Sequence, residues 1–216
     1  MSASITKLTP TSLSSLLCAR ICHDLISPVG ALGTAIEILD DPANVDMHDD
    51  ALDLVRTSSR QASAKLKFLR IALGAAGSAP GVIPTAEVTK LSNEMFADAK
   101  PELIWEIDSD GIDKNRARIL LNLIMLAIQA APRGGTVTVT RRGNGEGAEF
   151  TLISQGPKAR LDAAVAKAIA GKAPEDGFDG RSIQPLYANL LARDVGGTIG
   201  ASAEDTTITF KANFPG

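Results

Sequence analysis

The adjacent residues His23 and Asp24 are the pair in this sequence best suited to nucleophilic chemistry, and His23 is one of only two histidines. A carboxylate beside an imidazole can accept the proton of one ring nitrogen. This fixes the tautomer and makes the other nitrogen a better nucleophile. An ordinary solvated acid is the alternative interpretation of Asp24, so the surroundings of the pair have to decide between the two.

Helical periodicity over residues 11–39 predicts that His23 points away from the apolar side of its helix. At about 100° per residue, His23 falls about 160° from the centre of the apolar stripe. That stripe comprises Leu13, Leu17, Ile21, Leu25, Pro28, Leu32, Ile36 and Leu39. Polar or small residues share the side of His23, namely Arg20, Ser27, Gly30, Thr34 and Glu37. A solvated surface histidine is the alternative to a functional one here.

Pro28 stands four residues after Asp24 in the same predicted helix. Because proline has no N–H, it removes the backbone hydrogen bond to residue 24 and bends the helix. Beyond it, Gly30, Ala31 and Gly33 keep the helix surface low. Such a surface lets another protein approach closely, although loose helix packing also explains these glycines.

A nucleophilic histidine on the outside of a helix can accept a phosphoryl group from an aspartate of a partner protein and return it. The transfer needs in-line geometry and neutralisation of the charge on the phosphoryl oxygens. Arg20, one turn before His23, is available to neutralise that charge. The partner must supply the metal ion.

The face that carries His23 has to be positioned by the packing of its own helix against a second one. The second predicted helix covers residues 49–76, and its apolar and small residues alternate at the three- and four-residue spacing of a bundle seam. They are Leu52, Val55, Ser59, Ala62, Leu66, Leu69 and Leu73. The acidic segment 40–50, which contains Pro42, is predicted to be a loop. Two helices cannot bury two such stripes, so we expect a homodimer in which two hairpins form a four-helix bundle.

A Gly- and Pro-rich segment divides the chain. We predict a hairpin domain over residues 1–76, a linker over 77–84 and a second domain over 85–216. In the second domain, expected helices cover residues 114–131, 159–171 and 183–195. Expected strands cover residues 102–108, 135–142 and 148–155, and a closing hairpin covers 196–214. This order predicts an α/β sandwich with helices on one face of a sheet.

Composition narrows the classes of partner. The net charge of −3 argues against nucleic acid, which calls for a basic face. We find no run of about 18 apolar residues and no signal-like beginning, so we expect a cytoplasmic protein without a membrane span. Cys18 and Cys22 are expected to be small buried hydrophobes rather than a metal site or a disulfide.

The sequence "HDLISP", residues 23–28, resembles the phosphoacceptor box of histidine kinases, in which an acid follows the histidine and a polar residue and proline come after it. The hairpin resembles the dimerisation domain of these kinases, and the second domain resembles their ATP-binding domain. The resemblance therefore covers nearly the whole chain. It implies an α + α/β fold, a dimeric helical hairpin followed by a kinase-ATPase-like sandwich.

The nucleotide-binding motifs of that resemblance are broken. Asn122 is retained in the Asn-rich box, but Leu126 stands where the family has a metal-binding asparagine. In the Asp-x-Gly-x-Gly box, Ser154 replaces the aspartate and Lys158 the last glycine. The segment 182–187 contains no glycine, whereas the family has a glycine-rich box there that wraps phosphates. We expect no ATP site, with Asn122 as a remnant.

A kinase-shaped dimer with an acceptor histidine and no ATP site resembles the ChpT family of alphaproteobacterial histidine phosphotransferases. The resemblance implies that His23 is phosphorylated and that Asp24 assists it. Arg20, Ser27 and Gly30 would line the docking surface. The family relays phosphate from the receiver domain of the hybrid kinase CckA to cell-cycle regulators such as CtrA and CpdR. No cofactor is implied in this chain, because Mg²⁺ belongs to the receiver. A non-catalytic dimeric adaptor and an active kinase are the alternatives.

Overall fold

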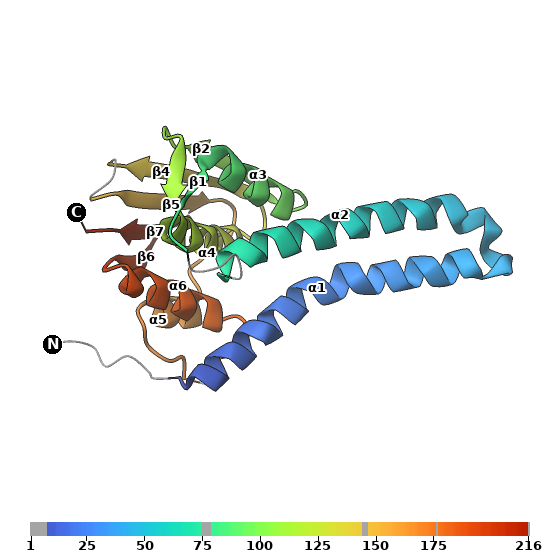
Figure 1. The fold of residues 1–216 in the computed structure, drawn as a ribbon, viewed down its shortest axis with the longest axis horizontal. Coiled ribbons are helices and arrows are strands. Elements are labelled where there is room, and N and C mark those ends of the chain that lie inside the picture. Colours follow the sequence, from blue (N-terminus) through green and yellow to red (C-terminus); the bar gives the residue numbers. More distant parts are fainter. Residues whose placement is uncertain (1–7, 75–78, 144–146, 176, 216) are drawn as a thin grey trace.

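A long helical hairpin extends from an α/β domain (Figure 1) in the computed structural model, which describes residues 8–74, 79–143, 147–175 and 177–215. Helices α1 (Pro10–Asp40) and α2 (His48–Ala72) run antiparallel and are joined by the 3-10 helix η1 (Pro42–Met47). The Thr9 side chain caps α1 by accepting a hydrogen bond from the backbone N–H of Ser12. Both ends of α1 lie within one residue of the prediction.

The connection and the end of the hairpin differ from the prediction. The expected loop is mostly η1, because Asp41 caps this short helix by accepting a hydrogen bond from Ala43 N–H. Helix α2 ends at Ala72 rather than at residue 76, and Gly74 follows with a positive φ of 84° that favours glycine. Residues 75 and 76 lie outside the described part of the chain.

The two helices of one chain leave much of their apolar surface uncovered. Helix α1 buries only Pro28 and Ala35, and the buried residues of α2 before Phe68 are the small Ala51, Ser58 and Ala64. Exposed apolar side chains remain on both helices, at Ile26, Val29, Ile36, Leu52, Leu54 and Leu66. Cys18 and Cys22 are also exposed, so the prediction that they are buried was wrong for the single chain. None of the described residues covers these two side chains.

The second domain is built on a five-stranded sheet of order β2-β4-β5-β7-β6. The strands are β2 (Pro101–Glu106), β4 (Gly135–Arg142), β5 (Glu149–Gln155), β6 (Thr198–Glu204) and β7 (Thr207–Asn213). Only the β2–β4 pair is parallel, and the other neighbours are antiparallel. The antiparallel neighbours β6 and β7 form the predicted closing hairpin.

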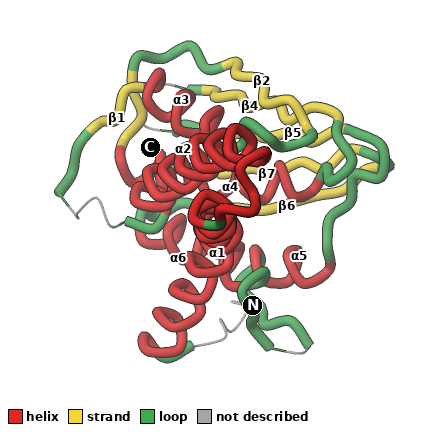
Figure 2. The backbone as a smooth tube through the Cα atoms, turned by 90° about the vertical axis from the view of Figure 1, so that its right-hand side faces the viewer, coloured by secondary structure: helices red, strands yellow, loops and turns green. Residues whose placement is uncertain are grey.

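One face of this sheet packs against helices, and the side chains between the sheet and the helices form the core. Helix α4 (Lys114–Ala130) is buried along most of its length and contacts β5 and β7. Helices α5 (Ala163–Ile169) and α6 (Ile183–Asp194) contact β6, and Figure 2 shows the helices gathered on one side of the strands. Phe150, Leu152 and Phe210 alternate inward from the sheet. The predicted α/β sandwich is confirmed.

Three elements of the second domain were not predicted. Helix α3 (Thr85–Met95) directly follows strand β1 (Val82–Pro84), which pairs with β3 (Gly111–Asp113). The end of the predicted linker 77–84 is therefore a strand. Strand β1 pairs with β3, which lies far along the chain, and the Gly/Pro-rich sequence around β1 does not indicate that partner.

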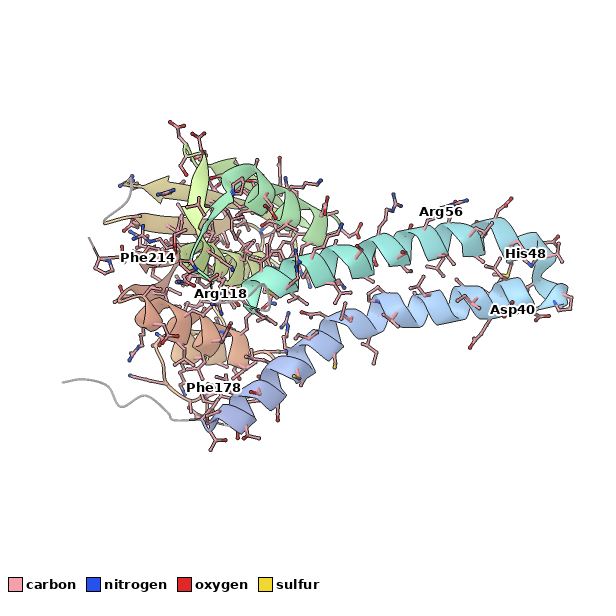
Figure 3. All side chains as sticks on the ribbon, viewed as in Figure 1. Asp40, His48, Arg56, Arg118, Phe178 and Phe214 are labelled. Atoms are coloured by element: carbon pink, nitrogen blue, oxygen red, sulfur yellow. The ribbon has the colours of Figure 1, made fainter. Side chains whose placement is uncertain are left out.

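The hairpin contacts the second domain along α2, which packs on α3 and bonds Asp98 through Gln61, and at the beginning of α1. The last turns of α2 join the core of the domain, where Phe68 meets Phe96 edge-to-face at 5.5 Å between ring centroids. The beginning of α1 packs Leu13, Leu16 and Leu17 near Phe178, which Figure 3 labels beside that end of the helix. Both ends of the hairpin base are thus attached to the α/β domain.

Among the described helices, α1 alone is long and apolar enough by length and composition to cross a membrane, with a best mean hydropathy of 1.3 over 18 residues. The sequence-based exclusion of such a segment was therefore too strict. Helix α1 also carries Arg20, His23 and Asp24 and packs on α6.

Candidate functional site

The His23 side chain projects from α1 into solvent and is 79% exposed. It is therefore accessible to another protein. Because His23 is neither covered by α2 nor buried in the core, packing does not account for a histidine at this position.

Asp24 lies against His23 and is itself largely buried. Its Oδ1 is 3.2 Å from Nδ1 of His23, and its side chain is only 10% exposed. A carboxylate accepts hydrogen bonds and does not donate them, so this contact favours the tautomer with the proton on Nδ1. The lone pair then lies on Nε2, the nitrogen free to act as a nucleophile.

Arg20 orients this carboxylate. Its Nε donates to Oδ2 of Asp24 at 2.9 Å, and the Arg20 side chain is 11% exposed. A partly buried, charge-assisted hydrogen bond of this kind holds the carboxylate rotamer. Sequence reasoning assigned Arg20 to the incoming phosphoryl group. The geometry pairs its Nε with Asp24, and Arg20 also lines a pocket with His23, so its role toward a phosphoryl group stays a prediction.

Lys65 of α2 fixes the same turn from the other helix. Its Nζ donates to the backbone carbonyl oxygen of Asp24 at 3.0 Å. That carbonyl has no helical partner because the residue four positions on is Pro28. The hydrogen bond from Lys65 therefore satisfies the acceptor that proline leaves open.

The helix surface beyond His23 is open. Ser27 and Gly30 are exposed, and a Cβ added at Gly30 or at Gly33 would meet nothing within 4 Å. The Thr34 hydroxyl donates to the carbonyl of Gly30 at 3.4 Å, within the same helix. A partner protein can therefore lie close to the backbone there.

His23 also borders a pocket between α1 and the second domain. The pocket has a volume of about 460 Å³, and His23 and Arg20 line one side of it. Leu126 and Gln129 of α4 contribute to the opposite wall, together with Arg160 and Arg181 from the loops beside α5 and α6. A molecule that reaches His23 from this side meets two arginines of the second domain.

The positions of the broken nucleotide motifs have other contacts. Asn122 is fully buried, and its Nδ2 donates to the carbonyls of Ala72 and Arg118, both at 2.8 Å. The buried Ser154 hydroxyl donates to the carbonyl of Ala127 at 2.8 Å and ties β5 to α4. These two side chains hold the protein together at the positions where the kinase family binds a nucleotide.

In the described ranges of the chain, no three His, Cys, Asp or Glu side chains are grouped so that they could hold a metal ion.

Comparison with known proteins gives the family. The model of the histidine phosphotransferase C-terminal domain matches residues 85–207. Protein phosphotransferase ChpT of Brucella abortus (strain 2308) is 39% identical over 205 residues, which cover 95% of this chain and 97% of that protein. The chain belongs to the ChpT family of histidine phosphotransferases.

Solved structures agree with the ChpT family fold. A bacterial phosphotransferase solved at 1.7 Å has a TM-score of 0.85 and 37% identity, and the match covers 97% of this chain and all of that one. The catalytic domain of the histidine kinase ThkA in a nucleotide-free form has a TM-score of 0.50 and 16% identity, covering 64% of this chain and 98% of that domain. The second likeness concerns the fold alone.

Sequence reasoning found His23, Asp24 and Arg20 but missed Lys65. Pro28 signals an unpaired carbonyl at residue 24, which could have prompted a search for a donor on the second helix. The sequence does not say which of its basic residues faces that carbonyl. Arg160 and Arg181 were missed because their proximity to His23 depends on how the second domain sits on the hairpin.

Proposed function

We propose that this protein is a phosphorelay intermediate that carries a phosphoryl group on His23 between aspartates of partner receiver domains. The observation that carries the proposal is the exposed imidazole whose Nδ1 lies 3.2 Å from the Asp24 carboxylate, since this leaves Nε2 as an accessible nucleophile. Membership of the ChpT family supports the same activity.

In the proposed step, the lone pair of His23 Nε2 attacks the phosphorus of an aspartyl phosphate. The Nε2–P bond forms, the bond from phosphorus to the aspartyl oxygen breaks, and the carboxylate leaves with the electron pair. The proton stays on Nδ1, and the negative Asp24 stabilises the positive charge that develops on the ring. Transfer to the next receiver reverses these bonds.

The proposed reaction needs neither ATP nor a metal site in this chain. The Asn122 Nδ2 group and the Ser154 hydroxyl both donate to backbone carbonyls of this protein, which supports the expectation that no nucleotide binds. The Mg²⁺ that neutralises the phosphoryl oxygens belongs to the receiver domain of the partner.

The receiver of a CckA-like hybrid kinase is the proposed donor, and CtrA-like and CpdR-like response regulators of the cell cycle are the proposed acceptors, in the cytoplasm. They dock on α1 around Ser27 and Gly30 and on the second-domain wall that carries Arg160 and Arg181. A second copy of the chain covers the exposed apolar faces of the hairpin to give the four-helix bundle.

A phosphotransfer assay tests the proposal. The protein and its His23→Ala variant are each mixed with a receiver domain that carries radiolabelled aspartyl phosphate, and a third sample receives labelled ATP alone. We expect acid-labile, alkali-stable label on the wild type only, with none from ATP alone.

Either of two other outcomes would overturn it. Label from ATP alone would make the protein a kinase. The absence of label under every condition would favour a non-catalytic adaptor, in which case His23→Ala would leave signalling intact in cells.

A further inference from the structure

The foot of α2 is held by a small network of buried polar side chains from the second domain. Asn122 of α4 donates to the carbonyl of Ala72, the last residue of α2. Arg118, labelled in Figure 3 at this junction, donates through Nη2 to the Tyr187 hydroxyl at 2.8 Å. That hydroxyl in turn donates to the carbonyl of Leu73 at 3.1 Å.

These hydrogen bonds satisfy carbonyl groups at the end of α2 and join the hairpin to the α/β domain. The last carbonyls of a helix have no intrahelical partner. Here α4 and α6 of the second domain supply donors to two of them, at Ala72 and Leu73. Each bond therefore crosses from the hairpin to the α/β domain and has a directional geometry.

The network is incompletely satisfied. Asn122 Oδ1, Arg118 Nε and Gln184 Oε1 are buried and have no hydrogen-bond partner among the described residues. Buried polar groups without partners lower the free energy of unfolding, so an apolar contact at this junction would make the protein at least as stable. The hydrogen bonds to the carbonyls of Ala72 and Leu73 are directional, so they form in only a narrow range of arrangements of the two parts.

The second attachment between hairpin and domain is of a different kind. Leu13, Leu16 and Leu17 of α1 pack in an apolar cluster with Ile183 and Leu186 of α6. Apolar burial is non-directional and fixes no register by itself. At the foot of α2 the polar network acts together with the contact of Phe68 with Phe96 and the hydrogen bond from Gln61 Nε2 to Asp98 Oδ2. Its bonds to the end of α2 add directional contacts that the apolar cluster of α1 lacks.

We propose that Asn122, Arg118 and Tyr187 are positioning residues that hold the α/β domain in one orientation, so that Arg160 and Arg181 stay opposite His23 as a preformed receiver-docking surface. This inference rests on the proposed phosphorelay function. It assigns a new role to Asn122, the residue retained from the broken nucleotide motif.

Three variants separate this role from general stability. Asn122→Leu removes both donors while keeping most of the volume, and Tyr187→Phe removes one hydroxyl. Asn189→Leu is the matched control. Asn189 is also buried, its Oδ1 also has no partner, and its Nδ2 also donates to a carbonyl at 2.8 Å, but that carbonyl belongs to Ile169 within the same domain.

Two phosphorylation reactions distinguish docking from chemistry. One uses a phosphorylated receiver domain, and the other a small phosphoramidate that labels His23 without docking. If the released domain adopts the docking orientation about one tenth of the time, the KM for the receiver rises about tenfold. We expect this rise in Asn122→Leu and Tyr187→Phe but not in Asn189→Leu, with phosphoramidate labelling unchanged in all three.

A distance measurement tests the orientation independently of activity. Spin labels are placed at Asp40→Cys on the hairpin and Glu204→Cys on the sheet, with Cys18 and Cys22 changed to serine. Labelled chains are diluted in excess unlabelled protein, so that only pairs within one chain are measured. We expect a narrow distance distribution that broadens in Asn122→Leu and Tyr187→Phe only.

The inference fails if both variants keep the wild-type KM and a narrow distribution, or if Asn189→Leu changes them equally. If Asn122→Leu does not fold, the isosteric Tyr187→Phe decides alone. If the wild-type protein transfers no phosphoryl group, the proposed function fails instead, and the distance distributions then decide whether the network sets the orientation.

Discussion

Lys65 Nζ donates to the one backbone carbonyl in α1 that Pro28 deprives of its helical partner, the carbonyl of Asp24. The side chain of the same Asp24 holds Nδ1 of His23 and the guanidinium of Arg20. The proline, the lysine and the aspartate therefore act together to set the position of the residue next to the nucleophile.

Replacing Lys65 with methionine keeps the aliphatic chain and removes the donor. The partly buried carbonyl of Asp24 then has no partner, so we expect the free energy of unfolding to fall by about 1–2 kcal/mol. Urea denaturation measures this loss. The exposed Lys67 provides the control, since Lys67→Met should change the stability little.

A double-mutant cycle shows whether Lys65 compensates for Pro28. In Pro28→Ala, the backbone N–H of residue 28 returns and can donate to the Asp24 carbonyl. We expect Lys65→Met to be less destabilising in that background, with a coupling free energy of about 1 kcal/mol. Additive effects would mean that Lys65 contributes only packing.

Asp24→Asn should slow phosphotransfer through His23 by about ten- to a hundredfold. The amide can present its NH₂ group to Nδ1, which favours the wrong tautomer and no longer offsets the charge on the phosphorylated ring. Rapid-quench measurement of transfer from a phosphorylated receiver gives the rate. Asp40→Asn, at an exposed site on the same helix, should transfer at the wild-type rate. Equal rates for the two variants would reduce Asp24 to a structural residue.

Leu66→Glu should dissociate the dimer. Leu66 is 52% exposed in the single chain, and the proposed four-helix bundle covers its face. A carboxylate buried there without a partner is costly, whereas in the monomer it would be solvated. Light scattering at micromolar concentration should report a dimer for the wild type and for Lys67→Glu, and a monomer for Leu66→Glu. A monomeric wild type would refute the dimer itself.

Asp179 should make the start of α6 sensitive to acid. Hydrogen bonds from the Ser182 hydroxyl and then from the Ser182 N–H lower the pKa of this carboxyl. A folded-state pKa below the unfolded one stabilises the protein above the unfolded pKa, and this contribution is lost as the pH falls through the folded pKa. Asp179→Asn should therefore be less stable than wild type at neutral pH, and the difference should shrink in denaturant titrations as the pH falls through the lowered pKa of Asp179. A gap that persists in acid would contradict the assignment.

The long elements and the outward position of His23 follow from periodicity, because an amphipathic helix has only one side that can face its partner. Helix α4 was predicted within one residue, since its apolar run is long and begins after the capping residue Asp113. The short α3 and the strands β1 and β3 were missed. Their stability comes from long-range pairing and packing rather than from local pattern.

The sequence predicted only those residues of the candidate site that lie on one helix. Arg20, His23 and Asp24 are neighbours on one helix, so their spacing places them together. Lys65, Arg160 and Arg181 reach the same place from other elements, and only the packing of α2 and of the second domain brings them there. The burial of Asn122 could not be predicted from the sequence either, since an asparagine can bind a ligand or cap a neighbouring helix.

The hairpin tip lies far from the α/β domain (Figure 1). His23 is in the first half of α1, Pro10–Asp40, and borders a pocket lined by the second domain. Residues 40–50 therefore take no part in the contacts that set the geometry of the nucleophile. Natural length variation should be concentrated at this end, and paired removal of one heptad from each helix would shorten the hairpin without moving His23 relative to the domain. The same end is the natural point for inserting a fluorescent or affinity tag into the chain.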